Sequence, residues 1–377
     1  MTIAPYEPEA LPIKDLDYGR LISLVGEANA ALARYDGLLQ AMVNPAILLS
    51  PLTSQEALLS SKIEGTVATM EEVLEYEAGA QEQDQEKIHD IQEIINYRHA
   101  LKLAQAHLLD RPIRLSLILQ LHKTLMDSVR GEDKSPGAFR TNQNWIGRIG
   151  RTIEEASFIP PSPLRLMDHL QAWEAYLDYR DFDALAQAAI VHAQFELIHP
   201  FKDGNGRIGR LLIPLFLYGK GQLSSPMFYL SGYFDTHRDE YIACLQDISR
   251  ERRWTEWIIF FLTAIIEQAK TNTGKVQEIM RLYDAMKARV RDITHSQHSA
   301  QVVDALFDRP TFQVGEFSKR TGINIQTAHA LVRQLHEEGV VTVIRESSGR
   351  RAAIYAFPWL VNIAEGRKVF QEAKESI

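Results

Sequence analysis

The chain has 377 residues, of which 45% are hydrophobic and 24% charged, and its formal net charge is −8. These values are ordinary for a globular protein of two or three domains. The composition excludes a membrane-spanning protein, since no apolar run reaches the ~18–20 residues needed, and residues 1–20 do not resemble a secretory signal. The negative charge excludes wholesale wrapping by nucleic acid, although a local DNA-binding surface stays open. The single cysteine fits a reducing, cytoplasmic location.

The N-terminal quarter of the chain is expected to be helical. Three prolines make residues 1–20 an extended arm, whereas residues 20–43 carry apolar side chains at helical spacing. A short helix is predicted at residues 54–64, with Gly65 as its C-cap. Residues 71–86 are rich in Glu and Gln, and we interpret them as a solvated stretch between helices.

The central part of the chain combines helices with one β-rich interruption. Residues 87–129 predict two helices. Residues 131–163 are richer in Gly, Pro and Asn, and β-forming side chains at 144–147 and 151–153 predict the two strands of a β-hairpin flap. Helical periodicity then returns from Pro163 to about Val290. The first 290 residues therefore predict one all-helical domain with a single β-hairpin flap.

The C-terminal part of the chain has a different pattern. A helix over Ala300–Phe307, two helices separated by a glycine turn over residues 314–338, and a hairpin over residues 340–357 follow one another. This order is typical of a winged-helix domain. The whole chain is thus expected to be mainly α. The expected domains are an N-terminal helical region (1–110), a central helical core (111–290), a winged helix (296–360) and a C-terminal helix or tail (361–377).

Residues 199–210 read His-Pro-Phe-Lys-Asp-Gly-Asn-Gly-Arg-Ile-Gly-Arg and predict a polyphosphate site. They lie between two helix-like stretches, so they form a loop that ends at a helix N-terminus. Such a turn presents unpaired N–H groups and a positive dipole end to an anion. Gly204 and Gly206 let the backbone adopt left-handed angles and approach a ligand closely.

The polar side chains of this loop favour phosphate chemistry. His199 is a base near neutral pH, although a lone histidine is more often a satisfied core residue. Asp203 would repel phosphate unless Mg²⁺ bridges the two. Asn205 either donates to a phosphate or caps the following helix. Arg207 and Arg210 can each bind phosphate oxygens in bidentate fashion, and their place in a helix's first turn disfavours ordinary surface ion pairs.

The segment from His199 to Arg210 resembles the signature of the Fic family of protein adenylyltransferases. The resemblance extends to Pro136–Thr141, to the flap and to residues 238–242, and so covers residues 10–290. It implies a nucleotidyltransferase that moves AMP from ATP to a Tyr, Thr or Ser hydroxyl of target proteins and of itself, releasing pyrophosphate. Gly206 stands where a phosphate-transferring sister group has Lys, which favours adenylylation.

The resemblance also implies a role for each site residue. His199 is the expected catalytic base, and Asp203 is the expected Mg²⁺ carboxylate. The flap near Ser157 and Phe158 would pair with an extended target segment by strand addition, and Tyr241 would contact the adenosine. The expected nucleotide-binding residues are Ser157, Phe158, Asp203, Gly204, Asn205, Gly206, Arg207, Arg210 and Tyr241.

Residues 60–65, with Ser60, Glu64 and Gly65 at the matching positions, resemble the inhibitory helix of the same family. A Glu64 carboxylate paired with Arg210 would occupy the space that the γ-phosphate of ATP needs. The plainer alternative is an ordinary glutamate at a helix end. In some relatives this glutamate positions a water molecule and removes AMP, so the sequence leaves both directions of the reaction open.

The winged-helix region raises a second class of function. DNA contacts are expected from the second helix and from the hairpin, although the same fold can serve packing or dimerisation. The chain would then be a transcriptional regulator whose Fic-like domain only senses nucleotide, but a sensor does not need the base His199. A homodimer is expected, since family members often pair, and no membrane partner is expected. The candidate DNA contacts are Asn324, Gln326, Thr327, His329, Arg333, Arg345, Arg350 and Arg351.

Overall fold

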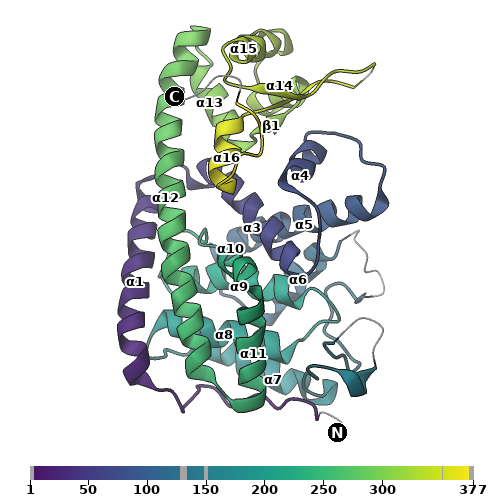
Figure 1. The fold of residues 1–377 in the computed structure, drawn as a ribbon, viewed down its shortest axis with the longest axis vertical. Helices are drawn as coiled ribbons and strands as arrows, with labels where there is room; N and C mark the ends of the chain where they lie inside the picture. The colour runs from purple at the N-terminus through teal and green to yellow at the C-terminus, as the bar shows by residue number, and fades with distance from the viewer. Residues whose placement is uncertain (1–3, 128–133, 148–151, 350, 373–377) are drawn as a thin grey trace. The chain divides into compact units, whose positions relative to one another are not determined.

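The computed structural model describes residues 4–127, 134–147, 152–349 and 351–372 (Figure 1). The described residues are mainly helical and include one small three-stranded sheet. Within these ranges, none of the helices combines the length and the apolarity needed to span a bilayer. The expectation of a mainly α chain is therefore confirmed.

The chain forms two compact units, each built from several segments. The first unit consists of Met1–Gly37, Leu59–Thr66 and Ile95–Lys270. The second unit consists of Leu38–Leu58, Val67–Ile94 and Thr271–Ile377. Four helices continue along the chain from one unit into the other, namely α1 (Tyr18–Ala41), α3 (Ser50–Ile63), α5 (Gln85–Leu108) and α12 (Trp254–Thr294).

The core of the first unit is the helix pair α8 (Ala184–Ile198) and α9 (Asn205–Gly219). Both helices are buried almost all round, as expected of helices that are apolar on every face. Asp183 caps α8 by accepting hydrogen bonds from the N–H groups of Leu185 and Ala186. Around this pair lie α6 (Leu115–Leu125), α7 (Leu166–Asp178), α10 (Ser231–Thr236), α11 (Arg238–Glu251) and the short 3₁₀ helices η2 (Ile153–Glu155) and η3 (Pro163–Arg165).

The second unit holds the sheet, in which the strand order is β1–β3–β2 and both pairings are antiparallel. Its hydrophobic centre includes Phe307, Phe312, Phe317 and Phe357. The elements are α2 (Pro45–Leu48), α4 (Met70–Glu77), α13 (Ser299–Asp308), β1 (Thr311–Phe312), α14 (Val314–Thr321), α15 (Ile325–Glu337), β2 (Thr342–Arg345), β3 (Ile354–Ala356) and α16 (Pro358–Glu365).

Two predictions about local structure are wrong. Residues 71–86 are not only a solvated stretch, because α4 begins at Met70 with a capping box between Thr69 and Glu72 and buries Val73 and Leu74. The flap is not a regular hairpin either. Its described residues form a single antiparallel bridge, Ile146 to Phe158, and η2 stands where a strand was predicted. Arg151, part of the predicted second strand, lies outside the described residues.

Candidate active site

The loop between α8 and α9 turns on two residues with left-handed backbone angles. His199 ends α8 at φ 51° and ψ 61°, and Gly204 precedes α9 at φ 75°. Asn205 holds the loop closed, because its side-chain oxygen accepts from the N–H of Phe201 (2.8 Å) and its side-chain amide donates to the Phe201 carbonyl (2.9 Å). Both polar atoms of Asn205 are therefore engaged in shaping the loop, which is neither of the two roles expected from the sequence.

Arg140 supports the same loop from outside. Its side chain is buried, and it donates from Nε to the His199 carbonyl (2.9 Å) and from Nη2 to the Pro161 carbonyl (2.6 Å). The backbone N–H of Arg140 also donates to the Pro200 carbonyl (2.9 Å). Burial lowers the pKa of Arg140 to about 10, so the side chain stays charged at neutral pH. Sequence reasoning did not assign this role, although Arg140 lies in the segment that resembles the family.

His122 is a second supporting residue that the sequence analysis missed. Its Nδ1 accepts from the backbone N–H of Gly137 (3.0 Å), so Nε2 carries the proton and donates to the Asp203 carbonyl (3.1 Å). The ring stacks on Phe201 with centroids 3.7 Å apart. Burial lowers the pKa of His122 to about 4. The one available signal was a histidine within the apolar helix α6.

His199 is arranged to accept a proton. Its Nδ1 lies 3.3 Å from the Glu196 carbonyl, an acceptor that fixes the proton on Nδ1 and leaves Nε2 with a free lone pair. Burial, together with the charge of Arg140, lowers the pKa of His199 to about 4 against the raising effect of the Glu196 carbonyl. The imidazole is therefore neutral at physiological pH.

Arg210 and Glu64 form an ion pair in which the Arg210 side chain is buried and the Glu64 side chain is 40% exposed. Nη2 of Arg210 lies 2.6 Å from Oε1 of Glu64 and also donates to the Ser60 carbonyl (2.8 Å), while Nε donates to Oγ of Ser60 (2.9 Å). Burial acts to raise the pKa of Glu64, but the charge and hydrogen bond of Arg210 bring it below its usual value. Burial acts to lower the pKa of Arg210, and Glu64 raises it overall. Both partners are ionised.

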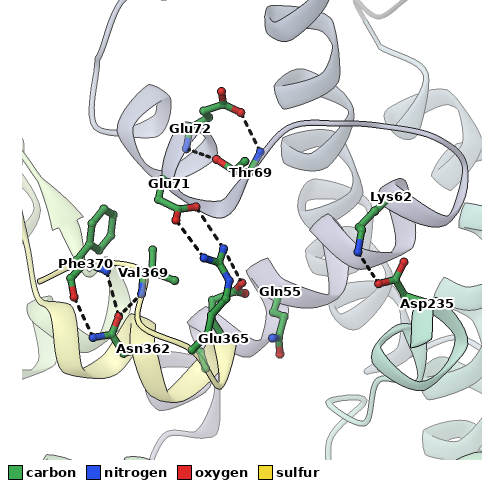
Figure 2. Close-up of polar contacts among 12 residues, drawn as sticks. Gln55, Lys62, Thr69, Glu71, Glu72, Asp235, Asn362, Glu365, Val369 and Phe370 are labelled. Carbon is green, nitrogen blue, oxygen red and sulfur yellow. Dashed lines mark hydrogen bonds and ion pairs between the residues drawn. The ribbon is translucent and has the colours of Figure 1, made fainter. Parts of the chain in front are cut away.

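The end of α3 is docked by contacts on either side of this pair. Nε of Arg238 donates to the Ile63 carbonyl (3.1 Å), and Lys62 forms an ion pair with Asp235 at 2.7 Å (Figure 2). Oε1 of Glu64 lies only 2.2 Å from the place that a Cβ on Gly206 would occupy. Glycine at position 206 is thus required for the close approach of the Glu64 carboxylate.

A cavity of about 240 Å³ joins these groups. It is lined by Glu64, His199, Gly206, Arg210 and Tyr241, among others. Its volume is below the ~300 Å³ that small-molecule pockets usually reach, and the Glu64 side chain fills part of the space. The structure thus brings some of the predicted site residues together at one cavity, namely Glu64, Phe158, His199, Gly206, Arg210 and Tyr241. The others are not among its lining residues, namely Ser60, Gly65, Ser157, Asp203, Gly204, Asn205 and Arg207.

Tyr241 is buried at one wall of the cavity. Its hydroxyl lies 2.9 Å from Nε2 of His192, and its ring stacks on Phe234 at 4.6 Å. Ile242 and Ser249 line the cavity as well. The wall next to Tyr241 combines an aromatic ring with small polar and apolar groups, which suits a nucleoside.

Glu196 is a cavity residue that the sequence analysis did not single out. Burial raises its pKa to about 8, with Arg210 opposing and Glu64 adding to the rise. Its Oε1 is buried and lies 2.1 Å from the place of a Cβ on Gly209. The Glu196 carboxyl is therefore mostly protonated at pH 7. Glu64 is then the carboxylate that balances the positive charge of Arg210.

Asp203 provides the single carboxylate of the loop. Its Oδ1 accepts from the Gly204 N–H (2.6 Å) and lies 3.7 Å from Nη2 of Arg207, and its side chain is 43% exposed. No cluster of three or more His, Cys, Asp or Glu able to hold a metal occurs in the part of the chain that the structure describes. One accessible carboxylate at a helix N-terminus fits Mg²⁺ that takes its other ligands from phosphate and water.

The flap residues present a short extended segment beside Ile146. The N–H of Ile146 donates to the Phe158 carbonyl (2.8 Å), and the Ser157 N–H donates back to the Ile146 carbonyl (2.8 Å). Oγ of Ser157 donates to the same carbonyl (2.9 Å). The Phe158 ring is buried and packs against Tyr6 at 5.7 Å. Phe158 thus acts as a cavity wall, and Ser157 fixes the flap backbone.

Family comparisons agree with this geometry. Residues 22–106 match the family described as Fic/DOC family N-terminal, and residues 112–217 match the Fic/DOC family. The chain is therefore similar to the Fic/DOC family over these two segments. The 199–210 loop lies within the second match, and Ser60 and Glu64 lie within the first.

Curated relatives and solved structures extend the comparison. "Protein adenylyltransferase Fic" of Drosophila erecta is 29% identical over 235 residues, which are 59% of this chain and 44% of the relative. "Protein adenylyltransferase fic-1" of Caenorhabditis elegans is 31% identical over 140 residues, 36% of this chain and 25% of the relative. The chain thus spans less than half the length of these relatives. A crystal structure of a Fic family protein from Desulfovibrio desulfuricans G20 has the same fold, with a TM-score of 0.57, 19% identity, and coverage of 94% of this chain and 98% of that chain.

Proposed function

We propose that this chain is a nucleotidyltransferase that moves AMP from ATP to a Tyr, Thr or Ser hydroxyl of target proteins and of itself. The observation that carries the proposal is the geometry of His199, whose Nδ1 faces the Glu196 carbonyl and whose ring lines one cavity with Arg210 and Gly206 of the N-terminal turn of α9. A base that accepts a proton next to an anion-binding turn is the arrangement that attack of an alcohol on a phosphate requires.

The chemistry follows from the geometry. Nε2 of His199 takes the proton of the attacking hydroxyl as the new oxygen–phosphorus bond forms at the α-phosphate. The bond from the α-phosphorus to the bridging oxygen breaks, and pyrophosphate leaves with that oxygen. The N–H groups at the start of α9, with Arg207 and Arg210, stabilise the charge on the departing pyrophosphate. Mg²⁺ on Asp203 supplies further neutralisation of phosphate charge when bound.

We further propose that Glu64 inhibits this reaction. An arginine that is already paired with a carboxylate is not available to the γ-phosphate, and the Glu64 side chain fills part of the cavity. Nε and Nη2 of Arg210 also donate to Ser60, and these hydrogen bonds keep the guanidinium directed at α3. ATP would then bind in an unproductive position or not at all.

Labelled nucleotide tests the proposal. The Glu64→Gly protein is incubated with ATP that carries the label on either the α- or the γ-phosphate, alone and with a cell lysate. Transfer of AMP predicts protein-bound α-label and no protein-bound γ-label. Protein-bound γ-label instead would mean that the chain transfers phosphate, and absence of both labels would contradict the proposed function.

Removal of AMP at the same site is a second candidate reaction. Glu64 is an ionised carboxylate in the same cavity as His199, so it is able to orient a water molecule toward a phosphorus atom there. Release of α-label from pre-modified protein by the wild type, but not by Glu64→Gly, would support this direction.

We also propose that residues 299–357 form a winged helix that binds duplex DNA. The order α13, β1, α14, α15, β2, β3 supports the assignment. Gln326, Thr327, His329 and Arg333 are exposed on α15, as DNA contacts require. Asn324 instead caps α15 by accepting from the Gln326 N–H (2.9 Å), and Arg350 lies outside the described residues. A regulator that senses nucleotide and binds DNA is the corresponding alternative to the enzyme.

A further inference from the structure

Two arginines of the proposed winged helix already hold anionic or polar partners from elsewhere in the second unit. Nη2 of Arg345, at the end of β2, forms an ion pair with Oε2 of Glu75 at 3.1 Å. Nη2 of Arg351 donates to the side-chain oxygen of Gln81 at 2.6 Å. Both partners lie in residues 71–81, which we call the acidic segment. Two of the four arginines predicted to contact DNA thus contact the segment that was predicted to be solvated.

The acidic segment is held in place by further contacts within the second unit. The two Glu71 oxygens accept from Nη1 and Nη2 of Arg367 (3.3 and 3.4 Å), as Figure 2 shows. The Leu74 carbonyl accepts from Oγ1 of Thr311 in β1 (3.2 Å). These contacts hold the segment beside the sheet with Glu75 against Arg345, so one guanidinium of the hairpin is already paired with a carboxylate.

A guanidinium group binds a carboxylate and a phosphate through the same pair of N–H donors. We propose that duplex DNA and the acidic segment compete for Arg345 and Arg351, and that DNA bound to α15 and the β2–β3 hairpin displaces the segment. Duplex DNA is the fitting partner because the exposed face of α15, which precedes β2 in the chain, is polar rather than apolar. It carries amide, hydroxyl and imidazole groups, which can form hydrogen bonds with base edges.

The displacement has a consequence for Glu64, and this step rests on the proposed function. Residues 59–66 belong to the first unit, whereas the chain on both sides of them belongs to the second. Before them, Oγ of Ser50 donates to the Asp308 carbonyl (2.8 Å), and Lys275 donates to Gln55 (2.9 Å). After them, the chain enters α4 and the acidic segment. Release of the acidic segment frees the chain that follows residues 59–66, while the contacts of Lys62 and Ile63 within the first unit stay in place. The helix end is then held less firmly, which lowers the occupancy of the Glu64–Arg210 pair.

The competition is tested by binding. Fluorescence anisotropy of a mixed-sequence duplex of about 30 base pairs is measured at about 50 mM salt, where phosphate contacts are strong. The chain with Glu71→Gln and Glu75→Gln should bind about three- to tenfold more tightly than wild type, because Glu75 no longer competes for Arg345 and Glu71 no longer holds the segment through Arg367. Arg345→Ala with Arg351→Ala should bind at least about tenfold more weakly. Equal affinities of the three proteins, or no binding by any of them, would overturn the proposal.

The coupling is tested separately by self-modification with α-labelled ATP. Saturating duplex should raise incorporation by the wild type several-fold and leave the Glu64→Gly protein, which has no inhibitory carboxylate, unchanged. Arg345→Glu alone should raise incorporation without DNA above the wild-type level. The reciprocal pair Arg345→Glu with Glu75→Arg rebuilds the ion pair and should return incorporation to the wild-type level. This pair therefore controls for loss of folding. If Glu64→Gly incorporates label but bound duplex does not change incorporation by the wild type, the coupling is refuted. If Glu64→Gly incorporates no label, the proposed function is refuted and the binding result is unaffected.

Discussion

Two neighbouring side chains set the properties of the cavity at the scale of single residues. His199 is kept neutral by burial, so it is a proton acceptor at physiological pH. Arg210 is kept charged and is neutralised by Glu64. His199 is therefore ready to act as a base, whereas Arg210 is already paired and cannot bind phosphate. A single substitution tests each of these roles.

Glu64→Gly should raise self-modification by tens-fold. The substitution frees Arg210 from a charge-assisted pair that contributes ~2–3 kcal/mol to the closed arrangement. Incorporation of α-labelled AMP over time measures the effect. Glu64→Gln is the matched control, because it keeps the side-chain volume and one acceptor oxygen but loses the charge, and an intermediate rise is expected. A wild-type rate equal to that of Glu64→Gly would contradict the inhibitory role.

The pH profile of transfer should reflect the lowered pKa of His199. A histidine with an ordinary pKa would lose half of its base form near pH 6.5, whereas a pKa of about 4 keeps the base form down to about pH 5. Initial rates of Glu64→Gly, measured in short assays from about pH 8 to 5, should stay within about twofold once the folded fraction is corrected for. An inflection near pH 6.5 would show that His199 is not the desolvated base described above.

At the scale of elements, the α8–α9 loop depends on a residue outside it. Arg140 donates to the carbonyls of His199 and Pro161, so one guanidinium joins the end of α8 to the segment that follows the flap. The loop geometry is therefore set by tertiary contacts as much as by its glycines.

Arg140→Ala should lower the free energy of unfolding by several kcal/mol, because it leaves buried carbonyl groups without donors at ~1–3 kcal/mol each. Arg165→Ala is the matched control, since Arg165 forms an ion pair with Glu7 in which both side chains are more than half exposed, and its effect should stay below ~1 kcal/mol. Urea denaturation followed by tryptophan fluorescence measures both. Similar losses in the two variants would contradict the structural role of Arg140.

The sequence predicts the elements that carry strong local signals and misses those that depend on partners. The loop at 199–210 and the C-cap at Gly65, whose φ is 104°, follow from their glycines and from the flanking apolar periodicity. Helix α4 was missed because its acidic composition indicates solvation, although Thr69 and Glu72 form a capping box. Its contacts with Thr311, Arg345 and Arg367 have no sequence signal. The contacts of Asn205 with Phe201 have no sequence signal beyond the residue type.

At the scale of the whole molecule, buried neutral histidines connect the site to stability. Burial lowers the pKa values of His122 and His199 to about 4 and that of His192 to about 3. The unfolded chain therefore binds more protons than the folded chain at these positions between about pH 4 and 6. Above the unfolded pKa of about 6.5 these histidines do not lower the free energy of unfolding. As the pH falls below that value, the free energy of unfolding decreases. Glu196, with its pKa raised to about 8, has the opposite sign and offsets one of the three.

His192→Asn should make stability less dependent on pH. Removing one such histidine lowers the slope of the unfolding free energy by ~1.4 kcal/mol per pH unit between about pH 4 and 6. Urea titrations at several pH values, followed through the buried Trp173, Trp254 and Trp257 of the first unit, measure the slope. Parallel curves for the variant and the wild type would show that His192 is not held neutral by the fold.

The measurement that tests the central claim most directly is the rate of AMP transfer by His199→Ala in the Glu64→Gly background, with ATP binding measured alongside. Removing a positioned general base costs ~10²–10⁴-fold in rate, so we predict a loss of at least about 100-fold with ATP affinity changed by less than about threefold. Undiminished transfer of the α-label by the doubly substituted protein would show that His199 is not the base, and the proposed function of this site would be wrong.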